Sequence, residues 1–307
     1  MRNSLLLTTI FLGLACSPLA AAQQRETDAT RLPLRYASPD NFPRWSASLA
    51  VVTKSWVKTA DLGTITPSDT SGDLKAQLAS ALDALDKQLA ARGARRNAII
   101  RLNVRFVGEK LEDTRLIGDA LAAYFAVRNN SMAGTVGGID YPVRSTVGVE
   151  SLEPAGAKVA LQVRLVEDGD SLTRELVNPE LRGRAATAPG TVLFGGVSAQ
   201  QKDFTIEGYD NFEHEVTGAV KNLAKVLANA SSGIGQVKTL TVYYAPHGKA
   251  EITDEVVRRN LLAALKTAGA KTVPKIEVQA VGSACTPQFQ VILDGEAIAP
   301  ATLAIAN

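Results

Sequence analysis

The chain has 307 residues, of which 46% are hydrophobic and 21% are charged, and its formal net charge is +2. This length exceeds one compact small domain and suits two domains of ordinary size. Because 33 basic and 31 acidic residues nearly cancel and no basic stripe is present, the composition argues against a protein that binds nucleic acid or an anionic membrane surface.

Few residues are available for metal or nucleophilic chemistry. Cys285 is the only cysteine outside the first 22 residues, and His214 and His247 are the only histidines. Their spacing does not match a zinc site or a Cys-His or Ser-His catalytic pair. We therefore expect no metal, no cofactor and no disulfide within the mature chain.

The first 22 residues have the pattern of a secretory signal. Arg2 precedes an apolar run over 5–15, which is too short to span a bilayer, and the segment ends in three alanines. We expect cleavage after Ala22 and a soluble protein in the periplasm or outside the cell. A lipoprotein signal is the alternative, because Cys16 follows a leucine and an alanine, but Gly13 stands where such signals prefer an aliphatic residue.

The rest of the chain contains a tandem repeat. At a separation of 138 residues, the apolar positions over 81–104 coincide with those over 219–242 without a gap. At a separation of 132 residues, Pro142 coincides with Pro274, and the six extra residues of the first copy lie in the connection at 129–140. The repeat predicts two copies of one structural unit.

Each copy is expected to contain the same elements in the same order. A strand is followed by an amphipathic helix, a second strand rich in β-branched residues, a second helix and a closing pair of strands. The predicted ranges in the two copies are 49–57 and 191–197 for the first strand, 74–89 and 216–227 for the first helix, 99–107 and 237–244 for the second strand, and 112–127 and 253–267 for the second helix, the last with Thr253 as its N-cap.

The closing segment of the first copy, 141–166, is predicted to be an antiparallel β-hairpin. Alternation in its first arm places three valines on one face and Arg144 and Thr146 on the other. The return arm at 157–165 alternates in the same way after a short turn that contains a proline and a glycine. The hairpin therefore presents a guanidinium group on the face opposite its apolar side.

This segment resembles the C-terminal hairpin of the RidA/YjgF family at two strings, PVRSTVGVESL at 142–152 and GAKVAL at 156–161. Members of that family hydrolyse reactive enamine and imine intermediates of amino-acid metabolism. The resemblance implies an α+β fold of two tandem RidA-like (chorismate-mutase-like) domains, each a mixed β-sheet with two helices packed on one face. It also implies that Arg144 holds a substrate carboxylate, a bidentate contact that suits a planar guanidinium.

Two further residues are candidates for substrate binding through the same resemblance. Thr146 falls where the family has a cysteine or a threonine, two residues after the arginine. Trp45 begins a Trp-Ser-Ala string that stands in the place of a family Tyr-Ser-Gln. Together with Arg144, these residues form the expected substrate-binding set, and the catalytic residue stays unassigned.

The family glutamate that handles the attacking water is missing from both copies. Its position falls on Ala160 in the first copy and on Ile292 in the second. In the second copy Ile276 also occupies the position of Arg144, and an apolar side chain cannot hold a carboxylate. We therefore expect the second copy to be structural.

The sequence divides into five segments. The stretch between the two copies is polar, contains two prolines and lacks the apolar periodicity of a helix or a strand, so it is the expected linker. These segments are a signal peptide at 1–22, an N-terminal extension at 23–44, a first RidA-like domain at 45–167, a linker at 168–189, and a second, degenerate RidA-like domain at 190–301.

Two functions remain open for an exported protein of this kind. The first is a hydrolase of the 2-iminobutanoate/2-iminopropanoate deaminase type in which Arg144 holds the substrate carboxylate. The second is a non-catalytic protein that binds small carboxylates or serves as an oligomeric scaffold. Family members form trimers, so we expect either a homo-oligomer, with a trimer favoured, or an intrachain pseudo-dimer.

Overall fold

The computed structural model describes residues 34–37, 50–55, 57–126, 142–167, 174–176, 190–200, 206–209, 211–285 and 287–300. The predicted signal peptide and Trp45 lie outside these ranges. In the part of the chain that is described, no helix is both long and apolar enough to cross a bilayer.

Strands and helices alternate along the chain in the order that the repeat predicts. The helices are α2 (Leu74–Ala91), α3 (Leu111–Ala126), α4 (Phe212–Asn229) and α5 (Asp254–Thr267), with short 3-10 turns η1 (Arg96–Ala98) and η5 (Ile234–Gln236). The strands are β1 (Leu34–Ala37), β2 (Ala50–Lys54), β3 (Thr59–Ile65), β4 (Ile99–Val107), β5 (Thr146–Val149), β6 (Val159–Val166), β7 (Arg174–Leu176), β8 (Gly190–Val197), β9 (Val237–Tyr244), β10 (Lys275–Ala280), β11 (Ser283–Ala284) and β12 (Val291–Ala299).

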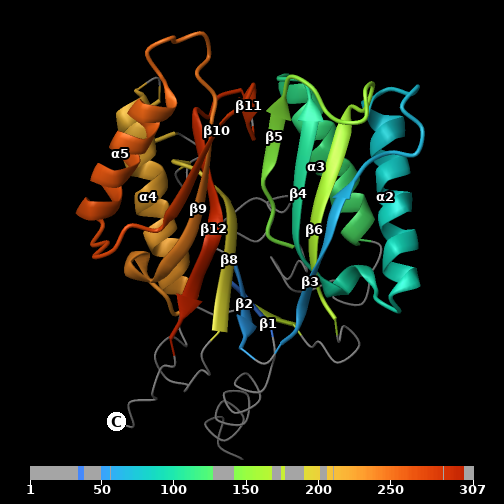
Figure 1. Cartoon of the computed structure of the whole chain (residues 1–307), viewed down its shortest axis with the longest axis horizontal. Helices are drawn as coiled ribbons and strands as arrows, with labels where there is room; N and C mark the ends of the chain where they lie inside the picture. The colour runs from blue at the N-terminus through green and yellow to red at the C-terminus, as the bar shows by residue number, and fades with distance from the viewer. Residues whose placement is uncertain are drawn as a thin grey trace, which may run out of the picture.

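Two β-sheets lie in the middle of the described structure, and the helices lie on their outer sides (Figure 1). One sheet has five strands in the order β11-β5-β4-β6-β3, with α2 and α3 on its outer face. The other has seven strands in the order β10-β9-β12-β8-β2-β1-β7, with α4 and α5 on its outer face. The fold is therefore α+β, as the sequence predicted.

The strand registers repeat at the separations found in the sequence. Val104 pairs with Leu161 in the first copy, and Val242 pairs with Leu293 at the equivalent place in the second. The strand order β3-β6-β4-β5 of the first copy is equivalent to β8-β12-β9-β10 of the second. Each contains one parallel pair, which is β4 with β5 in the first copy and β9 with β10 in the second. The structure thus contains the same unit twice.

Each copy has its own apolar core between helices and sheet. Leu78 and Leu85 of α2 are buried against β4, β6 and α3, and Val220 and Leu223 of α4 are buried in the corresponding core of the second copy. Burial of each large aliphatic side chain contributes about 1.5–3 kcal/mol. The predicted cap of α5 is confirmed, because the side chain of Thr253 accepts a hydrogen bond from the backbone N–H of Val256.

The predicted hairpin at 141–166 is wrong, because β5 and β6 are not neighbours. β4 lies between them and pairs with β5 in parallel and with β6 in antiparallel orientation. Alternation indicates which face of a strand is apolar, but not which strand it pairs with. The long buried strand β4 has backbone donors and acceptors along both edges, and these need partners on both sides.

The predicted first strand at 49–57 is also assigned to the wrong sheet. Its central part is β2, which pairs with β8 of the second copy, and β3 occupies the edge of the first copy beside β6. β3 is mostly exposed and contains Gly63 in a bulge, so its sequence lacks the apolar pattern of a buried strand. The predicted N-terminal extension and linker each contain one strand, β1 and β7, which pair with each other.

Gly295 is required by close packing in the middle of β12. A Cβ atom at this residue would lie 2.1 Å from the carbonyl oxygen of Thr239 and 2.8 Å from Cζ of Phe194. Neighbouring strands can pass this point because glycine has no side chain, and the pairing of β12 with β8 shifts register there.

We expect Gly295→Ala to lower the free energy of unfolding by about 1–3 kcal/mol, because the added methyl group forces two strands apart. Urea denaturation followed by circular dichroism measures this change. Gly118→Ala in α3 is the matched control, since a Cβ there meets nothing within 4 Å and a helical alanine adds up to about 1 kcal/mol. Equal stability of the two variants would contradict this account of Gly295.

Candidate functional site

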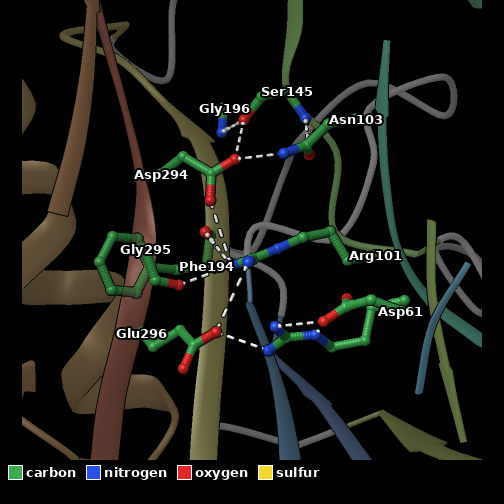
Figure 2. Close-up of polar contacts among 10 residues, drawn as sticks. Asp61, Arg101, Asn103, Ser145, Phe194, Gly196, Asp294, Gly295 and Glu296 are labelled. Carbon is green, nitrogen blue, oxygen red and sulfur yellow. Dashed lines mark hydrogen bonds and ion pairs between the residues drawn. The ribbon is translucent and has the colours of Figure 1, made fainter. Parts of the chain in front are cut away.

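Asp294 lies at the centre of the contact between the two copies (Figure 2). Its side chain is 5% exposed, and its Oδ1 atom lies 3.1 Å from Nη2 of Arg101. Its Oδ2 atom accepts hydrogen bonds of 2.8 Å from Nδ2 of Asn103 and from Oγ of Ser145. A carboxylate this deeply buried needs such partners, and all three belong to the first copy.

Arg101 also joins the backbones of the two copies. Its Nη2 atom donates to the carbonyl oxygen of Gly295 at 2.6 Å and to that of Phe194 at 3.3 Å. Both bonds come from one guanidinium nitrogen, Nη2, which also faces the carboxylate of Asp294. Arg101 therefore fixes β12 and β8 against β4.

A second group of charges continues the contact along the same strands. Arg164 of β6 donates to Asp61 with both Nε and Nη2, at 2.8 and 3.0 Å, and its Nη1 atom donates to Glu296 at 2.5 Å. Nη1 of Arg101 lies 3.8 Å from the same Glu296 oxygen. Hydrogen bonding to Asp61 raises the pKa of Arg164, so the guanidinium stays charged throughout the ordinary pH range.

Hydrogen bonds fix the backbone on both sides of Arg144, and the polar contact supplies those on one side. Ser145 donates its backbone N–H to Oδ1 of Asn103 at 3.1 Å, and its Oγ atom accepts the N–H of Gly196 at 2.9 Å. On the other side, Val143 is hydrogen-bonded to the backbone of β4 through both its N–H and its carbonyl group. Arg144 thus lies between two residues that cannot move independently of the sheets.

The second copy lies against Arg144 at two places. A Cβ atom on Gly196 would lie 2.5 Å from the Arg144 carbonyl oxygen, so the backbones touch there. β11 pairs with β5 in antiparallel orientation, and Ala284 lies opposite Val147. Cys285, the next residue, therefore lies at the level of Thr146. Arg144 is half-buried and Thr146 is buried. We call this meeting point of the two copies the Arg144 junction.

The thiol of Cys285 is close enough to Arg144 for the charge of the guanidinium to affect the pKa of the thiol. Burial raises the pKa of the Cys285 thiol, and the positive charge of Arg144 opposes this shift. The thiol is therefore protonated at neutral pH, and it is a weak hydrogen-bond donor rather than a nucleophile. The sequence did not indicate that this cysteine of the second copy lies beside an arginine of the first.

Both positions of the missing family glutamate are buried and hold apolar side chains. Ala160 is 2% exposed and Ile292 is 0% exposed. Neither side chain can hold a water molecule or transfer a proton. Within the described ranges, no group of three or more His, Cys, Asp or Glu residues could hold a metal ion.

Two hollows border the contact between the sheets, and Arg144 lines neither of them. A cavity of about 240 Å³ lies beside Arg101 and Arg164 on the five-stranded sheet. A larger cleft of about 530 Å³ lies between the copies and is lined by Glu109 and Glu150 from the first and by His247 from the second. Both arginines of the smaller cavity are already paired with carboxylates, so it offers no unpaired positive charge.

Sequence analysis did not single out Arg101, Asn103 or Asp294. A signal was present, because the polar residues Arg101, Asn103 and Arg105 alternate along β4 with fully buried apolar ones. In an isolated sheet such a face would contact water. Only the docking of the second copy makes these residues part of an interface.

Comparisons with known proteins agree with this architecture. No family model and no curated protein matches the chain. Among solved structures, a chorismatase is similar over 81% of this chain and 77% of its own, with a TM-score of 0.50 and 10% identity. A YjgF/YER057c/UK114 family protein of Mycobacterium tuberculosis matches 43% of this chain and 98% of its own (TM-score 0.29, 20% identity). The Rid family protein YyfB of Yersinia pestis matches 44% of this chain and 99% of its own, with a TM-score of 0.36 and 19% identity.

The similarity to chorismatase extends over most of both chains and covers both copies together. With the repeated strand order, it defines the class of protein as an α+β protein built from two related units. The chain has two copies of one α+β unit in tandem, the arrangement that the resemblance at 142–161 implied.

We expect Arg101→Ala to lower the free energy of unfolding by about 3–5 kcal/mol, because it leaves the buried carboxylate of Asp294 without its charged partner. Arg101→Ala with Asp294→Asn should lose less than the sum of the single variants, as a double-mutant cycle in urea would show. Lys221→Ala is the control, since its pair with Glu207 lies at the surface and contributes less than about 1 kcal/mol. Strict additivity would argue against a direct ion pair.

Proposed function

We propose that this chain is an exported RidA-like protein that binds a small carboxylate through Arg144. The observation that supports the proposal is the position of Arg144 at the junction of the two copies, between Val143, which is hydrogen-bonded to β4, and Ser145, which is hydrogen-bonded to Asp294. A side chain whose backbone is already fixed loses less conformational entropy when it binds a ligand.

The chemistry of the Arg144 junction suits an anionic ligand of small size. A guanidinium can donate two parallel hydrogen bonds to a carboxylate, and a partly buried position strengthens such charge-assisted bonds. Thr146 and the protonated thiol of Cys285 add uncharged donors in the same region. Trp45, the third candidate from the sequence, lies outside the described residues.

Binding without catalysis is the function that the geometry favours. Imine hydrolysis needs a positioned water and a group that passes a proton to the leaving nitrogen. The buried Ala160 and Ile292 occupy the positions from which a glutamate would act, and the second copy carries Ile276 in place of the arginine. Deaminase activity remains the second candidate, supported by Thr146 beside Arg144 and by the thiol of Cys285 as a proton donor.

The assembly that we propose is an intrachain pseudo-dimer. The inner faces of the two sheets meet each other, so neither copy needs another chain to cover its polar contact surface. Among the residues whose side chains the structure describes, Tyr209 and Val273 are the only large hydrophobic ones that are exposed. A surface with so few exposed apolar groups supports the pseudo-dimer over the trimer that the family resemblance favoured.

Arg144→Ala should weaken binding of a small 2-oxo acid such as 2-oxobutanoate by about ten- to a hundredfold in calorimetry, because a bidentate charged contact of about 1.5–3 kcal/mol is lost. Arg144→Lys should recover only part of the affinity, since an ammonium lacks the planar fork. Ile276→Ala, at the equivalent position of the second copy, should alter stability and leave binding unchanged. Unaltered binding by Arg144→Ala would refute the role given to this arginine.

The two candidate functions differ in a competition assay. An amino-acid oxidase generates 2-iminobutanoate or 2-iminopropanoate, and semicarbazide traps the imine unless an enzyme hydrolyses it first. We expect no decrease in semicarbazone formation at high protein concentration, because buried apolar side chains, Ala160 and Ile292, occupy the positions of the family glutamate. A decrease that is lost in Arg144→Ala but kept in Ile276→Ala would establish the deaminase instead.

A further inference from the structure

The smaller cavity, beside Arg101 and Arg164, lies on the inner face of the five-stranded sheet, away from the Arg144 junction. Its volume is about 240 Å³. At about 30 Å³ for each molecule of liquid water, this is the space of about eight waters. A site of this size is below the range of drug-sized ligands and suits a molecule of about eight to ten non-hydrogen atoms.

Two rows of cross-strand neighbours on β3, β6 and β4 line the cavity. One row is charged and the other is uncharged, and they are Asp61, Arg164 and Arg101, and Thr64, Gln162 and Asn103. In the charged row Arg164 binds Asp61 and Glu296, and Arg101 binds Asp294 (Figure 2). Two arginines thus face three carboxylates, so this row disfavours an anionic ligand.

A bulge in β3 shapes the side of the cavity. Two residues of this strand, Leu62 and Gly63, lie opposite the single residue Val163. The bulge turns Thr64 to the same face as Asp61, whereas simple alternation would turn it to the opposite face. Gly63 has a φ of 73°, which residues with a side chain rarely adopt, and a Cβ atom there would meet nothing within 4 Å. The bulge therefore brings a hydroxyl group to the cavity.

The uncharged row has free hydrogen-bonding groups. Asn103 uses both ends of its amide, on Asp294 and on the backbone of Ser145. The side chains of Gln162 and Thr64 make no hydrogen bond to any residue that the structure describes. Gln162 is half-buried and offers two N–H donors and a carbonyl acceptor, and the hydroxyl of Thr64 both donates and accepts.

The second copy shows how this fold can use the position of Gln162. At the separation of 132 residues Gln162 corresponds to Asp294, and the two residues pair with the equivalent positions Asn103 and Thr241. Asp294 is 5% exposed and binds three side chains of the other copy. The docking of the copies is therefore asymmetric at this pair. A position that is filled with polar contacts in the second copy faces a cavity in the first.

We propose that this cavity is a binding site for a small uncharged polyol, of the size of a tetritol or a pentose. A hydroxyl group both donates and accepts, so neighbouring hydroxyls can pair with the amide of Gln162 and the hydroxyl of Thr64 together. The carboxylate of Asp61 adds acceptor sites at the edge of the same cavity. Arg144 does not line this cavity, so the proposal is independent of carboxylate binding.

Titration with D-ribose, followed by two-dimensional ¹H–¹⁵N NMR of the whole protein, tests the site. The side-chain amide of Gln162 and the backbone amide of Gly63 should shift, with a dissociation constant on the order of 1–10 mM. Gln162→Leu should raise this constant about tenfold and Thr64→Val about threefold, because each removes uncharged hydrogen bonds. Thr59→Val is the matched control, since Thr59 is an exposed threonine of β3 that does not line the cavity, and it should bind as wild type does.

Two further titrations separate this site from the Arg144 junction. Arg144→Ala should bind ribose with the wild-type constant, and 2-oxobutanoate should leave the signals of Gly63 and Gln162 in place. Tighter binding of ethanolamine than of ribose at these signals would overturn the polyol as ligand and point to a cation. Equal ribose affinity of wild type, Gln162→Leu and Thr64→Val, or no shift of either signal at about 0.1 M ribose, would overturn the site itself.

Discussion

A carboxylate that is only 5% exposed, as that of Asp294 is, loses most of its hydration, and this loss costs several kcal/mol unless other groups compensate. The compensating groups are Arg101, Asn103 and Ser145, all of which belong to the first copy. β12 can therefore bury this residue only when the two copies are docked. The same contact holds Ser145, the residue next to Arg144, against the second copy.

The two copies have diverged into complementary surfaces. Arg101 and Arg164 are cross-strand neighbours in the first copy, and the equivalent pair in the second is Thr239 and Glu296. Two adjacent arginines repel each other unless carboxylates lie between them, and the second copy supplies Asp294 and Glu296. Docking of two first copies, or of two second copies, would bring like charges together. The charge pattern therefore selects the pairing of unlike copies.

The divergence extends to residues at the Arg144 junction and in the cores. The second copy has lost the arginine at Ile276, which is partly buried against its own core, but its glycine-containing strand end and Cys285 lie against the Arg144 junction. Buried Gln77 and Glu215 occupy equivalent positions and accept equivalent backbone N–H groups. The first copy therefore has a buried amide at this position and the second a buried carboxyl group.

The amino-acid sequence by itself determined the repeat, the helices and the central strands. The ranges 99–107 and 237–244 are confirmed as β4 and β9, because apolar periodicity is a local property that a strand carries in its own residues. The tertiary structure alone decided that β4 separates β5 from β6 and that β2 joins the second sheet. It also decided that the polar face of β4 is an interface. Periodicity reports which face of a strand is apolar, whereas the choice of partner depends on contacts between residues far apart in the chain.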